Sequence, residues 1–356
     1  MAAEIGNKQK LLSVIVPVYN VADYVERCIR SLEDQDIPNN DYEIICINDG
    51  STDTSREIIV NLQKEFENIT LIDQENQGVS RARNNGIDIA AGRYLMFIDS
   101  DDYVEKKSFA SILRNADYNK SQVSFLGFSV IDEGKTMPSI PDIKRKPFYL
   151  YPGIEAYLLA RVDVHNDPDR MVAVLFEKEF IDLYALRYLP GVPYLEDGEF
   201  IARILCLAER CIFDNHPFYL RTSRPGSATN SNLFHSGKAT KGFLLAASNL
   251  KRFQQEESLS ERQRLFLNQP ICKFAVLVVS SAQRPFNLKR INEARARLSR
   301  SGLYKLDLDN LDKEYTRLGY FYNKSIFVLI LIQLLDKAAA SIRSRILKLF
   351  IRSARV

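Results

Sequence analysis

The chain has 356 residues, of which 46% are hydrophobic, so it can bury a sizeable core and exceeds one average domain. Its net charge of +3 is unevenly placed: residues 321–356 carry seven Lys and Arg against one Asp, which leaves residues 1–320 at −3. A mildly acidic body argues against nucleic-acid binding, whereas a basic tail favours contact with an anionic surface.

The five cysteines are odd in number and contain no Cys-x-x-Cys pair. This pattern predicts reduced, mostly buried thiols in a cytosolic protein and argues against a structural zinc site. The first ten residues are polar and show no signal peptide or N-terminal anchor, so the expected location of the site is the cytoplasm.

Short apolar runs alternate with amphipathic segments over the first hundred residues. Strands are predicted at 11–18, 43–47, 69–72 and 94–98. Helices are predicted at 21–35, after a cap at Ser51, and at 78–90. This βαβαβαβ order with short connections predicts an α/β fold with a Rossmann-like, mostly parallel sheet flanked by helices.

Three aspartates, Asp99, Asp101 and Asp102, follow the fourth predicted strand. Ligands of open α/β sheets bind outside the carboxyl ends of strands, and closely packed carboxylates resist burial, so a divalent cation is the expected guest. The alternative is a solvated helix N-terminus capped by Asp101 or Asp102. Neither GxGxxG after the first strand nor a P-loop is present, so a metal on Asp99 and Asp101 is the expected partner of a diphosphate.

Four ordered stretches carry a family resemblance. They are Val16-Pro17-Val18-Tyr19-Asn20, Ile47-Asn48-Asp49-Gly50-Ser51-Thr52-Asp53, Ala82-Arg83-Asn84-Asn85-Gly86 and Phe97-Ile98-Asp99-Ser100-Asp101-Asp102. Together they resemble the family 2 inverting glycosyltransferases of the GT-A fold, of the bacterial polysaccharide type, with order and spacing kept over residues 11–105.

The resemblance implies roles for the donor-binding residues. Pro17, Val18 and Tyr19 would line the nucleotide base, and Asp49 would accept a hydrogen bond from it. Asp99 and Asp101 would serve the ribose and a divalent metal, Mn or Mg. Arg83 would lie near the nucleotide or phosphates; its alternative is a surface cation. Gly86 and Gly92 have a structural alternative, as packing or turn glycines.

A second acidic stretch, Tyr194 to Phe200, precedes a helix predicted to run through Ala208. In the resembling family this position supplies the catalytic base, and Asp197 matches it. An acceptor hydroxyl needs such a carboxylate within hydrogen-bond reach as it attacks. Glu196 or Glu199 would shape the site, and the alternative for these acids is a favourable interaction with the helix dipole.

The middle of the chain is less specific. A helix is predicted at 109–116 and strands at 123–131 and 171–176, with a Pro-rich loop at 137–147 that could cover the site. Asp163, His165, Asp167 and Asp169 are read as turn chemistry rather than as a metal cluster. Cys211–Phe213 and Phe218–Arg221 are predicted as short edge segments. The following loop, 221–230, resembles the family's diphosphate loop and contains Arg224; whether His235 or His165 touches a metal stays open.

From Lys241 onward the pattern is helical. The apolar run Phe327 to Leu335 is about half of the ~20 residues that a membrane span needs, so it predicts a buried or interfacial helix. Over 342–355 apolar and basic residues lie on opposite helical faces, the layout of a helix in a membrane surface; the alternative is a helix docked on the body. The expected domains are 1–235, with nucleotide-binding (11–105) and acceptor (106–235) halves, 236–320, and the tail 321–356.

The sequence therefore predicts a metal-dependent inverting transferase. It would move a hexosyl-type sugar from a nucleotide-diphosphate donor, a UDP-sugar by preference, to a saccharide hydroxyl in surface polysaccharide synthesis. A lipid-linked acceptor and a peripheral position at the inner membrane face, through residues 337–356, follow from the basic tail. The alternatives are a non-catalytic nucleotide-sugar-binding module and a metal-dependent nucleotidyltransferase. Donor, linkage and oligomeric state are left open.

Overall fold

The computed structural model describes residues 9–132, 135–138, 146–160, 172–222, 232–283, 287–336 and 338. The chain divides into two compact units, residues 1–231 and 232–356. The boundary thus lies four residues before the one expected after residue 235. The basic tail beyond residue 338, the loop residues 223–231 with Arg224, and residues 161–171 lie outside the described part of the chain.

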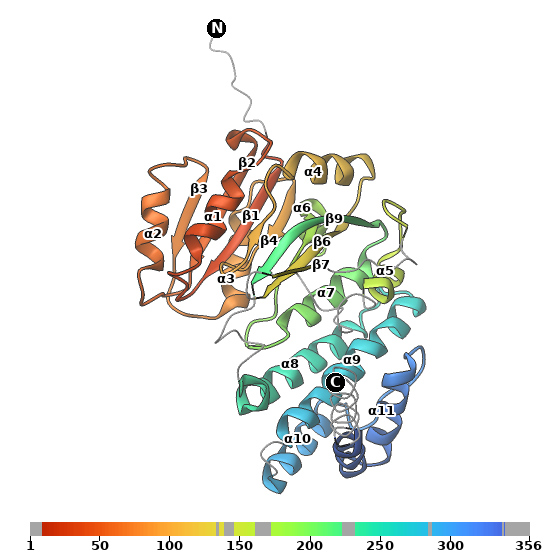
Figure 1. The fold of residues 1–356 in the computed structure, drawn as a ribbon. Helices are drawn as coiled ribbons and strands as arrows, with labels where there is room; N and C mark the ends of the chain where they lie inside the picture. The colour runs from red at the N-terminus through yellow and green to blue at the C-terminus, as the bar shows by residue number, and fades with distance from the viewer. Residues whose placement is uncertain are drawn as a thin grey trace, which may run out of the picture. The chain divides into compact units, whose positions relative to one another are not determined.

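The first unit is a mixed sheet with helices on both faces (Figure 1). Its strands are β1 (Leu12–Val18), β2 (Tyr42–Asn48), β3 (Ile69–Asp73), β4 (Tyr94–Phe97), β5 (Tyr103–Val104), β6 (Val123–Asp132), β7 (Lys135–Pro138), β8 (Val174–Glu177) and β9 (Cys211–Thr222). Its α-helices are α1 (Val25–Glu33), α2 (Ser55–Leu62), α3 (Val79–Ile89), α4 (Phe109–Tyr118), α5 (Gly153–Ala160), α6 (Lys178–Leu183) and α7 (Glu196–Leu207), and a short 3₁₀ helix, η1, covers Asn39–Asp41.

The strand order is β3-β2-β1-β4-β8-β6-β9-β5, with β7 paired to β6. Strands β3, β2, β1 and β4 run parallel, which confirms the predicted α/β class and the βαβαβαβ order. The chain moves from β1 out to β3 and then returns to β4, so right-handed crossovers put α1 and α2 on one face and α3 on the other. The carboxyl ends of β1 and β4 meet at this reversal of direction, where ligands of such sheets bind.

The second half of the sheet is mixed. Strand β8 pairs antiparallel with β4 and β6, whereas β9 pairs parallel with β6 and antiparallel with β5. The prediction of two short edge segments is therefore wrong, because β9 is one strand between β6 and β5. Register shifts on either side of Gly127 absorb the interruption by Pro217, which lacks an N–H group for the ladder.

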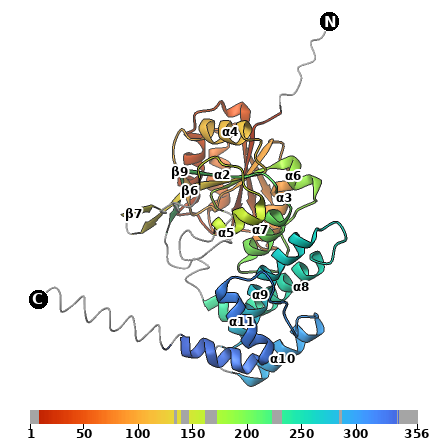
Figure 2. The ribbon, with the colours of Figure 1, turned by 90° about the vertical axis from the view of Figure 1, so that its right-hand side faces the viewer.

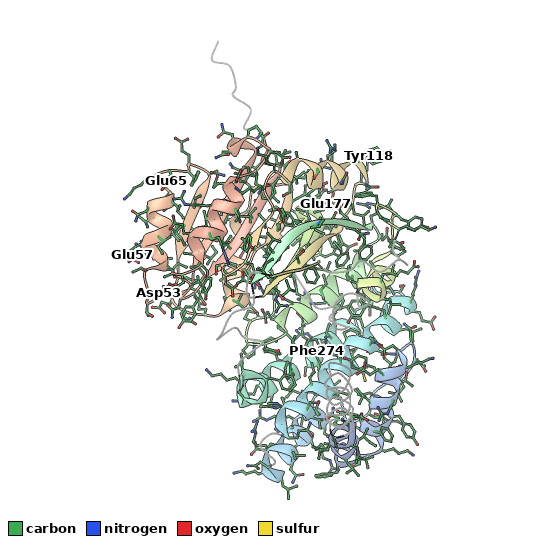
Figure 3. All side chains as sticks on the ribbon, in the orientation of Figure 1. Asp53, Glu57, Glu65, Tyr118, Glu177 and Phe274 are labelled. Carbon is green, nitrogen blue, oxygen red and sulfur yellow. The ribbon has the colours of Figure 1, made fainter. Side chains whose placement is uncertain are left out.

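Two helix starts differ from the sequence prediction. Helix α1 begins at Val25 rather than near residue 21, and α2 begins at Ser55 rather than after a cap at Ser51. Ser51 instead accepts a hydrogen bond from the Asn20 backbone N–H. Asp53, which is labelled in Figure 3, accepts from the Ser55 backbone N–H and hydroxyl. Asp53 thus acts at the start of α2, in the place assigned to Ser51.

The core of the first unit is built from apolar side chains of β1, β2 and β4 with the inner faces of α1, α2 and α4. All five cysteines of the chain are free and buried, as predicted. Gly86 and Gly92 are packing glycines, the structural alternative named for them: a Cβ on Gly86 would lie 2.4 Å from Ile15 Cγ2, and one on Gly92 would lie 2.4 Å from Ser13 N. Helix α3 therefore approaches β1 closely.

The second unit is helical, as predicted from Lys241 onward (Figure 2). It contains η3 (Asn232–His235), α8 (Gly237–Phe253), α9 (Glu261–Ala282), α10 (Leu288–Arg300), α11 (Lys313–Lys324) and a short apolar helix, Ile326–Asp336. Within the described residues α9 is the one helix long and apolar enough to cross a membrane, but 78% of its apolar window is buried inside the protein, as in the core helix of a soluble domain. Phe274 of α9 is fully buried (Figure 3).

Candidate active site

The site is organised by Arg83, which α3 carries into the interior of the first unit. The side chain of Arg83 is only 4% exposed. Its Nη1 donates to Glu196 Oε1 at 2.9 Å and to Asp197 Oδ1 at 2.8 Å, and its Nη2 donates to Asp99 Oδ1 at 3.0 Å. One buried guanidinium thus joins three predicted site residues from two distant stretches of sequence, Asp99 after β4 and the pair Glu196 and Asp197 at the start of α7.

The charge balance of this cluster favours a permanently charged arginine. Burial lowers the pKa of Arg83, but the carboxylates of Asp197, Asp99 and Glu196, together with Tyr188, outweigh burial and raise the pKa well above its ordinary value. A single positive charge therefore faces three carboxylates. The surface-cation alternative for Arg83 is wrong, because a buried arginine is held in place only by such partners.

Neighbouring contacts fix where Arg83 and its partners lie. Asn84 donates to the Tyr188 carbonyl at 2.9 Å and accepts from the Tyr188 backbone N–H at 2.7 Å, which ties α3 to the segment before α7. The Tyr188 ring stacks on Phe200 at 4.1 Å and lies 5.0 Å from the Arg83 guanidinium carbon. Burial raises the pKa of the Tyr188 hydroxyl, so this ring acts as a neutral wall of the site.

The start of α7 is locally strained. Leu195, directly before Glu196, has φ +57° in the left-handed region, which costs a non-glycine residue ~1 kcal/mol or more. Glu196 and Asp197 follow in the first turn, where the helix dipole favours negative charge. The dipole alternative and the functional interpretation are therefore both compatible with the position of Asp197, whose side chain is 22% exposed.

Glu199 has a different environment. It is fully buried and forms an ion pair with Arg203, with Nε to Oε1 at 2.7 Å and Nη2 to Oε2 at 2.9 Å. Arg203 also donates to the Arg187 carbonyl. These contacts give Glu199 a structural part in holding α7, whereas Glu196 is the acid that shares Arg83 with Asp197.

The three aspartates of the turn after β4 have different environments: Asp102 is buried against β9, whereas Asp99 and Asp101 are more exposed. The backbone N–H of Asp102 donates to the Asp99 carbonyl, and no helix begins here, so the helix-cap alternative for Asp101 and Asp102 is wrong. Asp102 is buried and accepts from Tyr219 Oη at 2.6 Å and from the Thr222 backbone N–H at 2.7 Å. Burial, then the charge of Asp99, raises the pKa of Asp102 to about 7. Asp102 therefore fastens the end of β9.

The other two acids suit a metal. The side chain of Asp99 is 38% exposed, and Asp101, two residues later in the same turn, is half-buried. Magnesium and manganese are held by one or two carboxylates plus phosphate oxygens, so this donor set fits such an ion once a diphosphate is present. Among the described residues no group of three or more His, Cys, Asp and Glu side chains is arranged to hold a metal by itself.

The residues predicted to bind the nucleotide base lie at the carboxyl ends of β1 and β2. Tyr19 is 50% exposed, whereas Val18 is buried and Pro17 is half-buried. Asp49 is buried, with Oδ1 accepting from Gln74 Nε2 at 2.6 Å and from the Gln77 backbone N–H at 2.8 Å. Its Oδ2 accepts from the Gly78 backbone N–H at 2.8 Å. Asp49 therefore positions the start of α3, in addition to the base-binding role predicted for it.

Three of the contributing residues were not singled out from the sequence. Tyr188 and Tyr219 belong to no sequence motif. Their roles come from contacts made in the fold, Tyr188 with Arg83 and Tyr219 with Asp102. Arg27 donates to the Asp101 carbonyl and to Thr222 Oγ1, and lies 4.4 Å from the Tyr103 ring centre. No local signal marks it.

The structure leaves several of the residues named in the sequence prediction without a described position, and it places one in the second unit. Arg224, Asp163, His165, Asp167 and Asp169 lie outside the described residues. His235 belongs to η3 of the helical unit, where its carbonyl accepts a hydrogen bond from Arg290.

The parallel β1–β4 half-sheet and the acidic turn after β4 are features of the GT-A fold, and the family model described as glycosyl transferase family 2 matches residues 13–169. The chain belongs to this family. A putative glycosyltransferase of Bacillus subtilis, EpsH, is 30% identical over 78% of this chain and 81% of its own length. The resemblance predicted from the motifs is thereby confirmed.

Two further likenesses are informative. The poly(ribitol-phosphate) β-glucosyltransferase of Bacillus spizizenii is 37% identical over 32% of this chain and 18% of its own length. The chain spans less than two thirds of the length of the first curated relatives that it matches. Residues 1–349 of S. aureus TarS, solved with UDP-GlcNAc, align with a TM-score of 0.66 and 20% identity, covering 90% of this chain and 89% of that one, which shows a shared fold.

Proposed function

We propose that this glycosyltransferase moves a hexosyl-type sugar from a UDP-sugar to a saccharide hydroxyl with inversion at the anomeric carbon. The observation that carries the proposal is the Arg83 cluster, in which the candidate base Asp197 and the candidate donor ligand Asp99 share one guanidinium. The UDP preference is supported by TarS, which has the same fold and was solved with UDP-GlcNAc. The nucleotidyltransferase alternative lacks a comparable observation.

In this proposal Asp197 accepts the proton of the acceptor hydroxyl as its oxygen attacks the anomeric carbon. A new C–O bond forms on one face of the sugar while the bond to the diphosphate breaks on the other, and the nucleoside diphosphate leaves with the bonding electrons. Such a single displacement inverts the anomeric centre. General-base assistance of this kind contributes ~100 to 10,000-fold to the rate.

The donor would be held at the carboxyl ends of β1, β2 and β4. Tyr19 offers an exposed ring to the base, with Pro17 and Val18 beside it, and Asp49 and Asp99 accept from the base and the ribose. Asp99 and Asp101 would hold a Mn or Mg ion that neutralises charge on the departing diphosphate. Arg224 is proposed to approach the same phosphates.

Arg83 acts in this mechanism through the carboxylates that it binds. Its hydrogen bond to Oδ1 fixes the orientation of Asp197, and its charge favours the ionised carboxylate that a base requires. Because the same guanidinium also binds Asp99, it holds the proposed donor-binding carboxylate, Asp99, and the proposed base, Asp197, in a fixed arrangement. Residues 11–105 would thus serve the nucleotide and residues 106–235 the acceptor.

The acceptor is proposed to be a lipid-linked saccharide of surface polysaccharide synthesis, reached at the cytoplasmic face of the membrane. Support comes from the basic tail, 337–356, and from the similarity to a poly(ribitol-phosphate) glucosyltransferase. Each base near an anionic surface contributes ~1 kcal/mol to binding. Replacing Arg345, Lys348, Arg352 and Arg355 by Gln should therefore weaken cosedimentation with anionic vesicles. Unchanged binding at low and physiological salt would contradict the membrane role and favour a docking or oligomerisation role for the tail.

A thermal-shift screen of UDP-, GDP- and dTDP-sugars, with and without Mn²⁺, tests the donor assignment. A ligand that binds only the folded state raises the melting temperature by mass action. We expect one UDP-sugar to do so in Mn²⁺ and to lose the effect in EDTA. Stabilisation by none of the nucleotide sugars would contradict the proposal, and Lys64→Gln, on the exposed surface, provides a neutral control.

A further inference from the structure

The short helix Ile326–Asp336 of the second unit has two apolar faces. Leu329 and Ile330 are buried to 4% exposure or less on one face. On the other face five large apolar side chains are 38–56% exposed, and we call them the apolar stripe: Phe327, Val328, Leu331, Leu334 and Leu335. At 100° per residue they cover an arc of about 120° opposite the buried face.

Hydrogen bonds fix which face points inward. Gln333, on the buried side, donates to the Ser280 hydroxyl of α9 at 2.8 Å and accepts from Gln283 at 3.0 Å. Asp336, the only acid of the helix, is paired with Arg317 of α11 through both guanidinium nitrogens. The helix is therefore held to α9 and α11 in one rotation, and the stripe is left on the outside.

The size of the apolar stripe marks it as an interaction surface. Five side chains at about half exposure present roughly 400 Å² of apolar area, the scale at which a patch on a soluble domain becomes functional. A stable dimer needs about 800 Å² on each partner, so the stripe alone covers about half of a homodimer interface. A partner that adapts to a narrow stripe is favoured.

Charge selects among the occupants that could cover the stripe. The helical unit, residues 232–356, has 23 Lys and Arg against 9 Asp and Glu, a net charge of +14, whereas residues 1–231 have 25 against 36, a net charge of −11. The segment 337–356, which follows the stripe directly, contains six of these bases and no acid. If the same unit of a second copy covered the stripe, two units of net charge +14 would face each other. If the tail folded back over the stripe, its net charge of +6 would lie against the +8 of the rest of the unit. Charge repulsion therefore opposes both occupants.

We propose that the apolar stripe inserts into an anionic lipid surface, with the basic residues of the helical unit on the lipid headgroups. A narrow exposed apolar face on a unit with a high positive net charge is the combination expected of an interfacial element. This inference deepens the proposed membrane acceptor, and it adds a folded insertion surface to the tail. The helical unit thereby holds the enzyme where a lipid-linked saccharide is confined to two dimensions.

Cosedimentation of the full chain with vesicles tests the insertion. The variant Leu331→Asn, Leu334→Asn, Leu335→Asn removes the outer part of the stripe, and Leu288→Asn on α10, 54% exposed, is the matched control. Vesicles contain phosphatidylcholine with or without 30% phosphatidylglycerol. We expect the triple variant to bind anionic vesicles at least tenfold more weakly at physiological salt, where charge is screened, and the control to bind like the parent.

The other occupants give different results. If the tail covers the stripe, the triple variant binds vesicles as tightly as the parent and its tail becomes more sensitive to trypsin. If a second copy covers it, light scattering shows a dimer in the parent and a monomer in the triple variant, with vesicle binding unchanged. Either result overturns the inference. Because neither readout needs catalysis, failure of the glycosyl-transfer proposal is seen separately, in the nucleotide-sugar screen.

Discussion

Removing the guanidinium of Arg83 should uncouple the carboxylates that it joins. Arg83→Met keeps most of the side-chain volume but leaves Glu196 and Asp197 as adjacent, partly buried charges, 13% and 22% exposed. Two unit charges about 4 Å apart interact by ~4 kcal/mol at an effective dielectric of 20, and loss of one member of a buried pair costs ~3–5 kcal/mol. We expect Arg83→Met to lower the free energy of unfolding by about that amount.

A double-mutant cycle with Asp197→Asn measures the coupling directly. Asp197→Asn removes one of the stranded charges, so the double variant should be ~1–3 kcal/mol more stable than the sum of the single effects predicts. Urea unfolding followed by circular dichroism gives all four values. As a control, Arg203→Met breaks the neighbouring pair with Glu199 and should combine with Asp197→Asn almost additively.

The same cycle in turnover separates a positioning role from a donor-binding role. If Arg83 acts through the base, Arg83→Met lowers kcat within the ~100 to 10,000-fold range of base loss, and adding it to Asp197→Asn changes kcat little further. The affinity for UDP in Mn²⁺ should stay within about tenfold of the parent value, because a positive charge has been removed from beside Asp99 rather than from a phosphate. Full additivity in kcat with a large loss of UDP affinity would refute the positioning role.

Three further perturbations have definite expected outcomes. Asp101→Ala should abolish Mn²⁺-dependent UDP binding measured by calorimetry. Asp102→Ala should chiefly lower the free energy of unfolding by ~1–3 kcal/mol, because it removes the hydrogen-bond acceptor of the buried Tyr219 hydroxyl. An equal loss of Mn²⁺-dependent binding in both variants would contradict the different roles given to the two aspartates. Gly86→Ala should destabilise by ~1–3 kcal/mol in urea unfolding, because its Cβ would lie 2.4 Å from a side-chain atom on β1, and an unchanged midpoint would contradict the close packing of α3. Burial raises the pKa of Glu33, so its folded state favours the protonated carboxyl, and the stability that it contributes at low pH is lost as pH rises through the folded pKa. The stability of Glu33→Gln relative to the parent should therefore increase from pH 4 to pH 8. If the free energy of unfolding has the same pH dependence in both proteins, Glu33 does not contribute to it.

Local patterns predicted most of the first unit because they are set by short-range physics. Near-continuous apolar runs are typical of strands buried on both faces, and the runs at β1, β2 and β4 lie within a residue or two of their predicted bounds. The motif spacing placed Asp99 and Asp197 at the ends of elements that the fold brings together. Strand β9 was predicted as two segments because extra residues around Pro217 bulge out of its ladder with the distant strand β6, and no local pattern reports that the pairing continues on both sides of the bulge.

Side-chain partnerships were predicted less well than positions. The resemblance placed Arg83 near the donor, which stays a prediction, but it did not give the three carboxylate partners of Arg83, which lie 16 to 114 residues away along the chain. The same limit applies to Asp102, for which the sequence predicted no partner and which accepts hydrogen bonds from the end of β9 in the fold. Contacts of this kind depend on the topology of the sheet, so they can be identified only from the three-dimensional structure.

The configuration of the first product tests the central claim most directly. With the α-linked UDP-sugar that the screen selects, time-resolved proton NMR can follow the anomeric signal of the sugar as it reaches water or an added acceptor, before mutarotation blurs it. A single displacement assisted by Asp197 predicts a β product first, and a signal that disappears in Asp197→Asn while UDP binding persists. An α product first, or unchanged turnover in that variant, would contradict the account.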